Sequence, residues 1–220
     1  MRGSARSHRP PSLRQPPEAA YSLPAYPRAS RRPGGASAAS PKVACPGRWT
    51  TATLLWQLFH PDEGALEQRP FHEIIPALES GESDLGVCIH EARFTYEAHG
   101  LELIEDLGAT WERETGAPLP LGGIFARRSL GDEQTARVTA LIQASLAYGR
   151  ANPDEALTSM RRYAQEFEDD VLREHVTLYV NEFTTALGEV GEGALSVLCE
   201  RARHAGLLKE ESAPLEIFGG

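Results

Sequence analysis

The stretch Asp84-Leu-Gly-Val-Cys-Ile-His-Glu-Ala-Arg-Phe-Thr-Tyr96 decides the fold class that the sequence predicts. Residues 85–89 form a short apolar run without polar alternation, which is typical of a strand covered on both faces. Such strands occur in parallel α/β sheets, where ligands bind beside the carboxyl ends of the strands. The run therefore predicts an α/β domain with a binding site where this strand ends.

His90 stands at that strand end, and Glu91 follows it. Neighbouring strand side chains point to opposite faces of a sheet, so the two residues need not share a task. Because imidazole side chains titrate near neutral pH, His90 is a candidate general base. On the local pattern alone, a hydrogen-bonded histidine at a strand end is the stronger interpretation.

A second candidate site precedes this strand. Lys42-Val-Ala-Cys45 predicts a short strand closed by Pro46-Gly47, and apolar spacing predicts a helix over 52–59, preceded by Thr50 and Thr51. A strand, a glycine turn and hydroxyls at a helix start make an anion site, because unpaired N–H groups and the positive end of the helix dipole face the ligand. A plain N-cap by Thr50 or Thr51 explains the same residues equally well.

Composition divides the chain into three parts. Residues 1–40 contain seven Arg and one Glu among many Pro, Ser, Ala and Gly residues, which predicts a disordered tail that can be deleted with little effect on stability. Residues 41–130 mix predicted strands and helices around His90. Residues 131–220 are predicted to be helical, with a strong helix start at Asn152-Pro153.

Three smaller elements complete the predicted α/β part. Leu101 to Leu107 alternates apolar and acidic residues, which indicates a more exposed strand. We further expect a turn to begin at Trp111, and an extended strand over 118–126.

Several function classes are excluded. The part after residue 40 is strongly acidic, which argues against nucleic acid as a partner, and no apolar run has the length of a membrane span. Three scattered cysteines fit reduced thiols in the cytoplasm rather than disulfides or zinc ligands. His90-Glu91 is no zinc motif, because Phe94 stands where the second histidine would fall. We expect no metal site, and histidine acid/base chemistry remains.

The sequence resembles the 1,4-dihydroxy-6-naphthoate synthase family of the futalosine route to menaquinone. The likeness is carried mainly by Ile89-His-Glu-Ala-Arg-Phe-Thr-Tyr96, with support from Pro46-Gly-Arg-Trp-Thr-Thr-Ala52, Asp106-Leu-Gly108, Thr115-Gly-Ala-Pro-Leu-Pro-Leu-Gly-Gly123 and Tyr179-Val-Asn181. It implies a two-lobed fold like that of periplasmic solute-binding proteins (type II), with a small-molecule carboxylate substrate held between the lobes.

The resemblance also implies the chemistry. Cyclic dehypoxanthine futalosine would be cleaved to 1,4-dihydroxy-6-naphthoate and dihydroxyacetone, without metal or redox cofactor. His90 matches the family's proton-abstracting base, and Thr51 and Ala52 match its substrate contacts at a helix start.

One departure from the family leaves alternatives open. The family's Ser-Pro-Cys-Pro-Asn-Asp-like opening and its Lys-Leu-Ser stretch are not in residues 1–40. We therefore expect a complete second lobe, a first lobe represented mainly by C-terminal helices, and a poorly active chain with an exposed apolar face at Val176, Tyr179, Val180 and Phe183. The rival interpretations are a binding module without chemistry, a chorismate-dehydrating lyase of the same fold, and an inactive truncated product.

Overall fold

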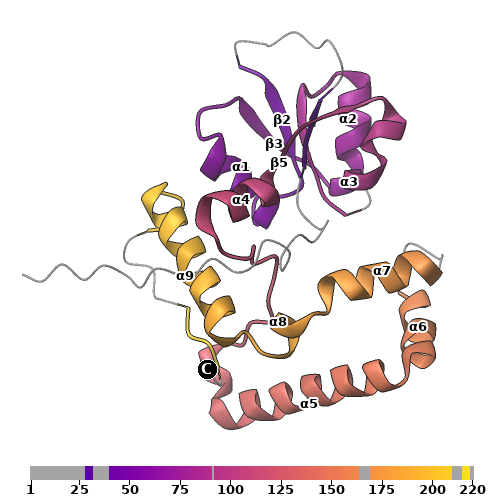
Figure 1. The fold of residues 1–220 in the computed structure, drawn as a ribbon. Coiled ribbons are helices and arrows are strands. Elements are labelled where there is room, and N and C mark those ends of the chain that lie inside the picture. The colour runs from indigo at the N-terminus through magenta and orange to yellow at the C-terminus, as the bar shows by residue number, and fades with distance from the viewer. Residues whose placement is uncertain (1–27, 32–39, 91, 164–168, 210–214, 219–220) are drawn as a thin grey trace, which may run out of the picture.

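A mixed five-stranded sheet is the centre of the computed structural model, which describes residues 28–31, 40–90, 92–163, 169–209 and 215–218 (Figure 1). The strand order is β3-β2-β4-β1-β5. The strands are β1 (Arg28–Arg31), β2 (Lys42–Cys45), β3 (Ala65–Gln68), β4 (Leu85–Cys88) and β5 (Glu102–Asp106). The strands predicted around residues 42–45, 85–89 and 101–107 are confirmed.

The strand directions bring several carboxyl ends to one edge of the sheet. β2 runs parallel to both β3 and β4. β1 runs antiparallel to β4 and to β5, so β4 and β5 point the same way. The loops that follow β2, β3, β4 and β5 therefore leave from the same edge, where the predicted site lies.

β1 overturns part of the expectation for residues 1–40. Arg28–Arg31 forms a strand between β4 and β5, with Arg28 paired to Cys88 on one side and to Asp106 on the other. Polar composition did not predict it, because strand pairing uses backbone groups that any residue except proline supplies. Deletion of residues 1–40 would remove this strand, so we expect the deletion to lower stability rather than to have little effect. The remaining tail up to residue 39 lies outside the described residues.

Two apolar clusters pack on the two faces of the sheet. On one face, α1 (Thr51–Phe59) and α4 (Leu107–Thr115) surround a cluster that includes Trp56 and Trp111. On the other, α2 (Ile74–Ser80) packs beside α3 (Ala92–Thr95) and the short 3₁₀ helix η2 (Tyr96–His99). Helices cover both faces of the sheet, as the apolar run in β4 predicted (Figure 1).

The contact between α2 and β4 is very close. Gly86 lies beneath α2, where a Cβ atom would come within 2.7 Å of Ile74 Cγ2 and 2.8 Å of Leu78 Cδ1. A glycine in a strand interior is used where another element approaches the backbone. The glycine at this position therefore allows the helix to seat against the sheet.

Two predictions between residues 107 and 126 are wrong. Trp111 does not begin a turn but lies inside α4. Asp106 caps the start of this helix, because its Oδ1 accepts hydrogen bonds from the Gly108 and Ala109 N–H groups at 3.2 and 3.1 Å. Gly116 ends the helix with φ 65°. Residues 118–126 form no strand.

The chain after residue 127 is helical in its described parts. A short 3₁₀ helix η3 (Arg128–Leu130) leads into the helices α5 (Asp132–Ala151), α6 (Pro153–Arg161), α7 (Asp169–Tyr179), α8 (Glu182–Thr185) and α9 (Gly188–His204). Helices α5 to α7 extend away from the sheet, whereas α9 returns to α1 (Figure 1). None of the described helices is long and apolar enough to cross a membrane.

Several exposed apolar side chains lie on α5, and Ile124 and Phe125 before it are 79% and 78% exposed. Leu141 is 70% exposed, and Val138 and Tyr148 are also exposed. Of the residues expected to be exposed farther on, Tyr179 is exposed, whereas Val176, Val180 and Phe183 are half-buried. The apolar face thus begins earlier in the helical part than we expected.

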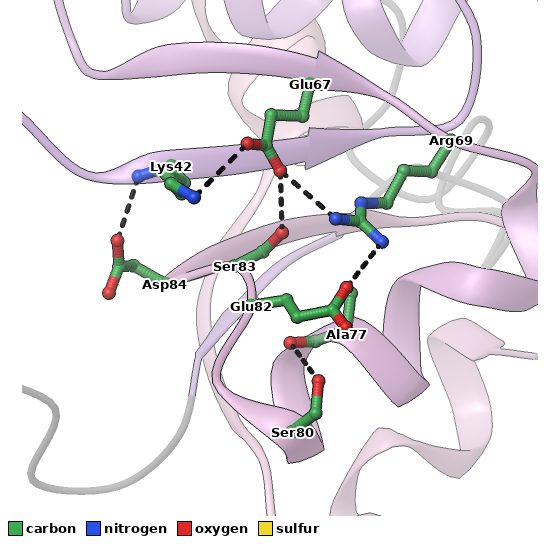
Figure 2. Close-up of polar contacts among 8 residues, drawn as sticks. All are labelled: Lys42, Glu67, Arg69, Ala77, Ser80, Glu82, Ser83 and Asp84. Atoms are coloured by element: carbon green, nitrogen blue, oxygen red, sulfur yellow. Dashed lines mark hydrogen bonds and ion pairs between the residues drawn. The ribbon is translucent and has the colours of Figure 1, made fainter.

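A charge network ties the outer strand β3 to the starts of β2 and β4 (Figure 2). Glu67 lies at its centre, 3.3 Å from Arg69 and 3.6 Å from the Lys42 ammonium, and it accepts a hydrogen bond from Ser83. Arg69 also bonds to Glu82 at 2.9 Å. Burial alone would raise the pKa of Glu67, but the Arg69 hydrogen bond and the two positive charges hold it below its usual value.

The network predicts a specific loss of stability in acid. A carboxylate whose pKa is lowered by folding stabilises the native state above its unfolded pKa, near the ordinary value of 4.5, and the stabilisation is lost as pH falls through the folded pKa. The free energy of unfolding, measured with urea, should therefore fall less between pH 7 and acid pH in Glu67→Gln than in the parent chain. Glu200→Gln, at an exposed position of α9, is the matched control and should keep the full drop.

Candidate functional site

The first candidate element is the start of α1, directly after β2. Gly47 adopts φ 129° and its carbonyl accepts three hydrogen bonds, from the Thr50 N–H, the Thr50 hydroxyl and the Thr53 hydroxyl. Thr50 is the N-cap, because its Oγ1 accepts from the Thr53 N–H at 3.2 Å. The N-cap interpretation thus applies to Thr50, and Thr51 is the first helical residue.

Thr51 and Ala52 differ in what they offer a ligand. The Thr51 hydroxyl donates to the Leu121 carbonyl at 3.1 Å, and the Pro120 carbonyl lies 3.5 Å from the same oxygen. Ala52 is 3% exposed, in the core cluster with Leu55. Because the hydroxyl proton is already used, an anion at this place would bind the N–H groups that start the helix. The segment around Pro120 lies against this helix start.

Cys45, at the end of β2, is not a nucleophile in this environment. Its side chain is fully buried, and burial raises the pKa of the thiol to about 11, against the opposing effect of a hydrogen bond with Thr53. The thiolate is the reactive form of cysteine, and it is scarce at neutral pH when the pKa is this high. Cys45 therefore acts as a packing residue beneath the loop.

His90 follows β4 at the same edge of the sheet. The strand ends at Cys88, and His90 forms the turn after it, with an exposed side chain. Its φ is 54°, and among the described residues other than glycine it alone has a positive φ. Its ring meets the ring of Phe71 edge to face, at 4.9 Å between centroids. Glu91 lies outside the described residues.

The topology thus brings the two candidate elements to one edge but not into a single cluster. β2 and β4 are parallel neighbours, so the start of α1 and His90 leave the sheet side by side. Sequence reasoning missed two contributors, the carbonyls at Pro120 and Leu121 and the ring of Phe71. Both reach the site through contacts distant in sequence, and no local pattern marks such contacts.

A second histidine lies in a polar cluster away from these elements. His60 Nε2 is 2.7 Å from Glu105 Oε2, and the Thr110 hydroxyl donates to the other oxygen of Glu105. His60 also stacks on Trp56 at 4.4 Å. This cluster joins the end of α1 to β5 and α4, so we give it a structural role and not a catalytic one. Among the described residues, no group of three His, Cys, Asp or Glu side chains is arranged to hold a metal ion.

The family model described as menaquinone biosynthesis matches residues 29–204, which include all of β1 except Arg28. The chain belongs to the menaquinone biosynthesis family. The two curated relatives are both called 1,4-dihydroxy-6-naphtoate synthase. The one from Thermus thermophilus is 44% identical over 174 residues, and the one from Streptomyces coelicolor is 43% identical over 171 residues.

The chain matches only part of each of these two relatives. The aligned part covers 79% of this chain but 64% of the Thermus thermophilus relative, and 76% of this chain but 61% of the Streptomyces coelicolor relative. The chain therefore spans less than two thirds of either relative.

Solved structures agree with the expected fold class. A protein from Archaeoglobus fulgidus is 33% identical with a TM-score of 0.75, covering 84% of this chain and 69% of that protein. The ligand-binding component of an ABC-type import system from Staphylococcus aureus, solved with zinc bound, has a TM-score of 0.56 at 12% identity, over 84% of this chain and 65% of that one. The second likeness shows the fold alone, which is an α/β fold like that of periplasmic binding proteins.

Proposed function

We propose that this menaquinone-family chain acts as a 1,4-dihydroxy-6-naphthoate synthase, which cleaves cyclic dehypoxanthine futalosine to 1,4-dihydroxy-6-naphthoate and dihydroxyacetone. The identity of 43–44% to two relatives of that name carries the proposal. In it, residues 41–130 together with β1 form the lobe that bears His90, and the helices of 131–220 belong to the other lobe.

His90 is the base in this proposal. Its exposed imidazole stands where ligands bind in parallel α/β sheets. A neutral imidazole takes a proton from a carbon of the substrate, and the electron pair left on that carbon opens the ring. The positive φ of His90 turns the chain away from β4. This turn fits a side chain that acts on a substrate bound beyond the carboxyl ends of the strands.

The start of α1 holds the substrate carboxylate. The N–H groups of Thr51 and Ala52 have no partner within the helix, since the first turn of a helix leaves its donors unpaired. The Thr53 N–H is already capped by Thr50. Negative charge is stabilised at such a helix start, which supports substrate binding at the α1 start beside proton transfer by His90 in this proposal.

The decisive test is product formation. Purified chain is incubated with cyclic dehypoxanthine futalosine, with and without the remaining part of the Thermus thermophilus relative as a separate polypeptide, and 1,4-dihydroxy-6-naphthoate is measured by chromatography. Product that requires His90 supports the proposal. Tight substrate binding without product under both conditions would instead identify a carboxylate-binding module, and no binding would refute the proposal.

Thr51→Val should raise KM while kcat changes little. The substitution removes the hydroxyl that ties the α1 start to the Leu121 carbonyl, but it keeps the backbone N–H groups. A hydrogen bond contributes about 0.5–1.5 kcal/mol net, so KM should rise roughly 3- to 10-fold. Thr51→Ser keeps the hydroxyl and is the control. A fall in kcat at unchanged KM would place Thr51 in the chemical step.

A further inference from the structure

The backbone of His90 adopts a conformation that its surroundings must maintain. With φ 54° it lies in the left-handed region, where a side chain with a Cβ atom is disfavoured. Such conformations persist at functional sites only where neighbouring groups hold them. Because the His90 side chain is exposed, its orientation depends on the few groups that touch it.

Phe71 is one such group. Its ring centroid is 4.9 Å from that of His90, and the two ring planes meet at 65°. This is the edge-to-face arrangement that aromatic pairs favour, because the positive edge of one ring faces the negative face of the other. The contact therefore favours one orientation of the imidazole over its alternatives.

Phe71 itself is held firmly at the same edge of the sheet. It begins the 3₁₀ helix η1 (Phe71–Glu73), which follows β3 and leads directly into α2. Before it, the Arg69 N–H donates to the Cys45 carbonyl at 2.9 Å. After it, Ile74 and Leu78 are fully buried. The backbone that carries the Phe71 ring is therefore held in place by contacts on both sides of it in the chain.

We propose that Phe71 is a positioning residue, which fixes the imidazole of His90 for proton abstraction. The catalytic consequence rests on the proposed function, whereas the fixed ring contact is independent of it. Phe71 acts through His90, so its loss affects the chemical step and leaves ground-state binding of the substrate largely intact.

The ring contact is tested by NMR on the purified chain. The His90 ring resonances are assigned by their loss in His90→Gln, which also separates them from those of His72, whose ring lies 5.6 Å from Phe71. We expect nuclear Overhauser contacts between the Phe71 and His90 rings and a single His90 rotamer. Both should vanish in Phe71→Leu and persist in Phe71→Tyr. A His90 ring that averages over rotamers in the parent chain would overturn the proposal.

The catalytic consequence is tested by kinetics under the conditions in which the chain makes product. Phe71→Leu should lower kcat about 10-fold with KM within about twofold, because a reacting group that loses its orientation slows chemistry more than binding. Phe71→Tyr should restore kcat, and Phe218→Leu, at an exposed phenylalanine near the C-terminus, is the control.

The two arms separate failure of this inference from failure of the proposed function. An unchanged kcat in Phe71→Leu, in a chain that does make product, overturns the positioning role while the proposed function stands. If the parent chain makes no product under any condition, the proposed function fails. The NMR arm then still decides whether Phe71 fixes the ring of His90.

Discussion

Replacement of His90 by alanine should lower kcat for naphthoate formation by roughly 10²- to 10⁴-fold and leave the fold intact, because this is the usual contribution of a positioned general base. The exposed position at the end of β4 explains why the fold should tolerate the change. Alanine removes the base and relaxes no core contact. Circular dichroism and the unfolding midpoint should therefore match those of the parent chain.

The control for this prediction is His99→Ala. His99 is also exposed; it ends η2 and pairs with Glu79 of α2 at 2.8 Å. Its loss should change kcat less than about twofold, because an exposed ion pair contributes little even to stability. Retention of more than about a tenth of the activity in His90→Ala would assign the base to another residue.

Trp111→Ala should have the largest effect on stability, about 3–5 kcal/mol of unfolding free energy, as is usual when a buried tryptophan is truncated. Trp111, on α4, is fully buried in the cluster that also contains Trp56. Its indole N–H donates to the Pro118 carbonyl at 3.3 Å, so the substitution also frees the segment that lies against the start of α1. Chemical denaturation measures the loss.

Trp49→Ala provides a matched control within the same chain. Trp49 is 89% exposed, and its contact is with the Arg48 guanidinium at 5.0 Å from the ring centroid. An exposed cation–π pair contributes about 0.5–1 kcal/mol, so Trp49→Ala should lower the free energy of unfolding by no more than that. Equal losses for both tryptophans would contradict the burial of Trp111 described above.

Local patterns predicted the elements whose partners lie close in sequence. The apolar run of β4, the threonines at the start of α1 and the Asn152-Pro153 start of α6 each carry their own signal. The helix α4 also carries one, since Asp106 is a preferred N-cap and Gly116 a preferred terminator, so the turn that we expect at Trp111 is a wrong interpretation. That error belongs to the interpretation and not to the sequence.

Contacts between distant segments could not be predicted. No pattern in Arg28–Arg31 predicts a strand. The segment is a strand because its backbone pairs with β4 on one side and β5 on the other, and both partners lie far away in sequence. Phe71 contributes to a helix pattern, which says nothing of its approach to His90. The candidate site was therefore predicted as two separate elements, and the groups that hold them were found only in the structure.

The place of β1 sets the order in which the sheet can close during synthesis. Of the strands in the described residues, β1 leaves the ribosome first, yet its partners include Asp106, so it cannot be seated on both sides until that residue has emerged. Pairings so far apart in sequence form slowly, because the intervening loop must close first. β2, β3 and β4 can assemble earlier, which leaves one edge of β4 unpaired in the interval. Such an edge readily pairs with other chains, so the nascent protein is most vulnerable to aggregation just before its earliest strand is inserted.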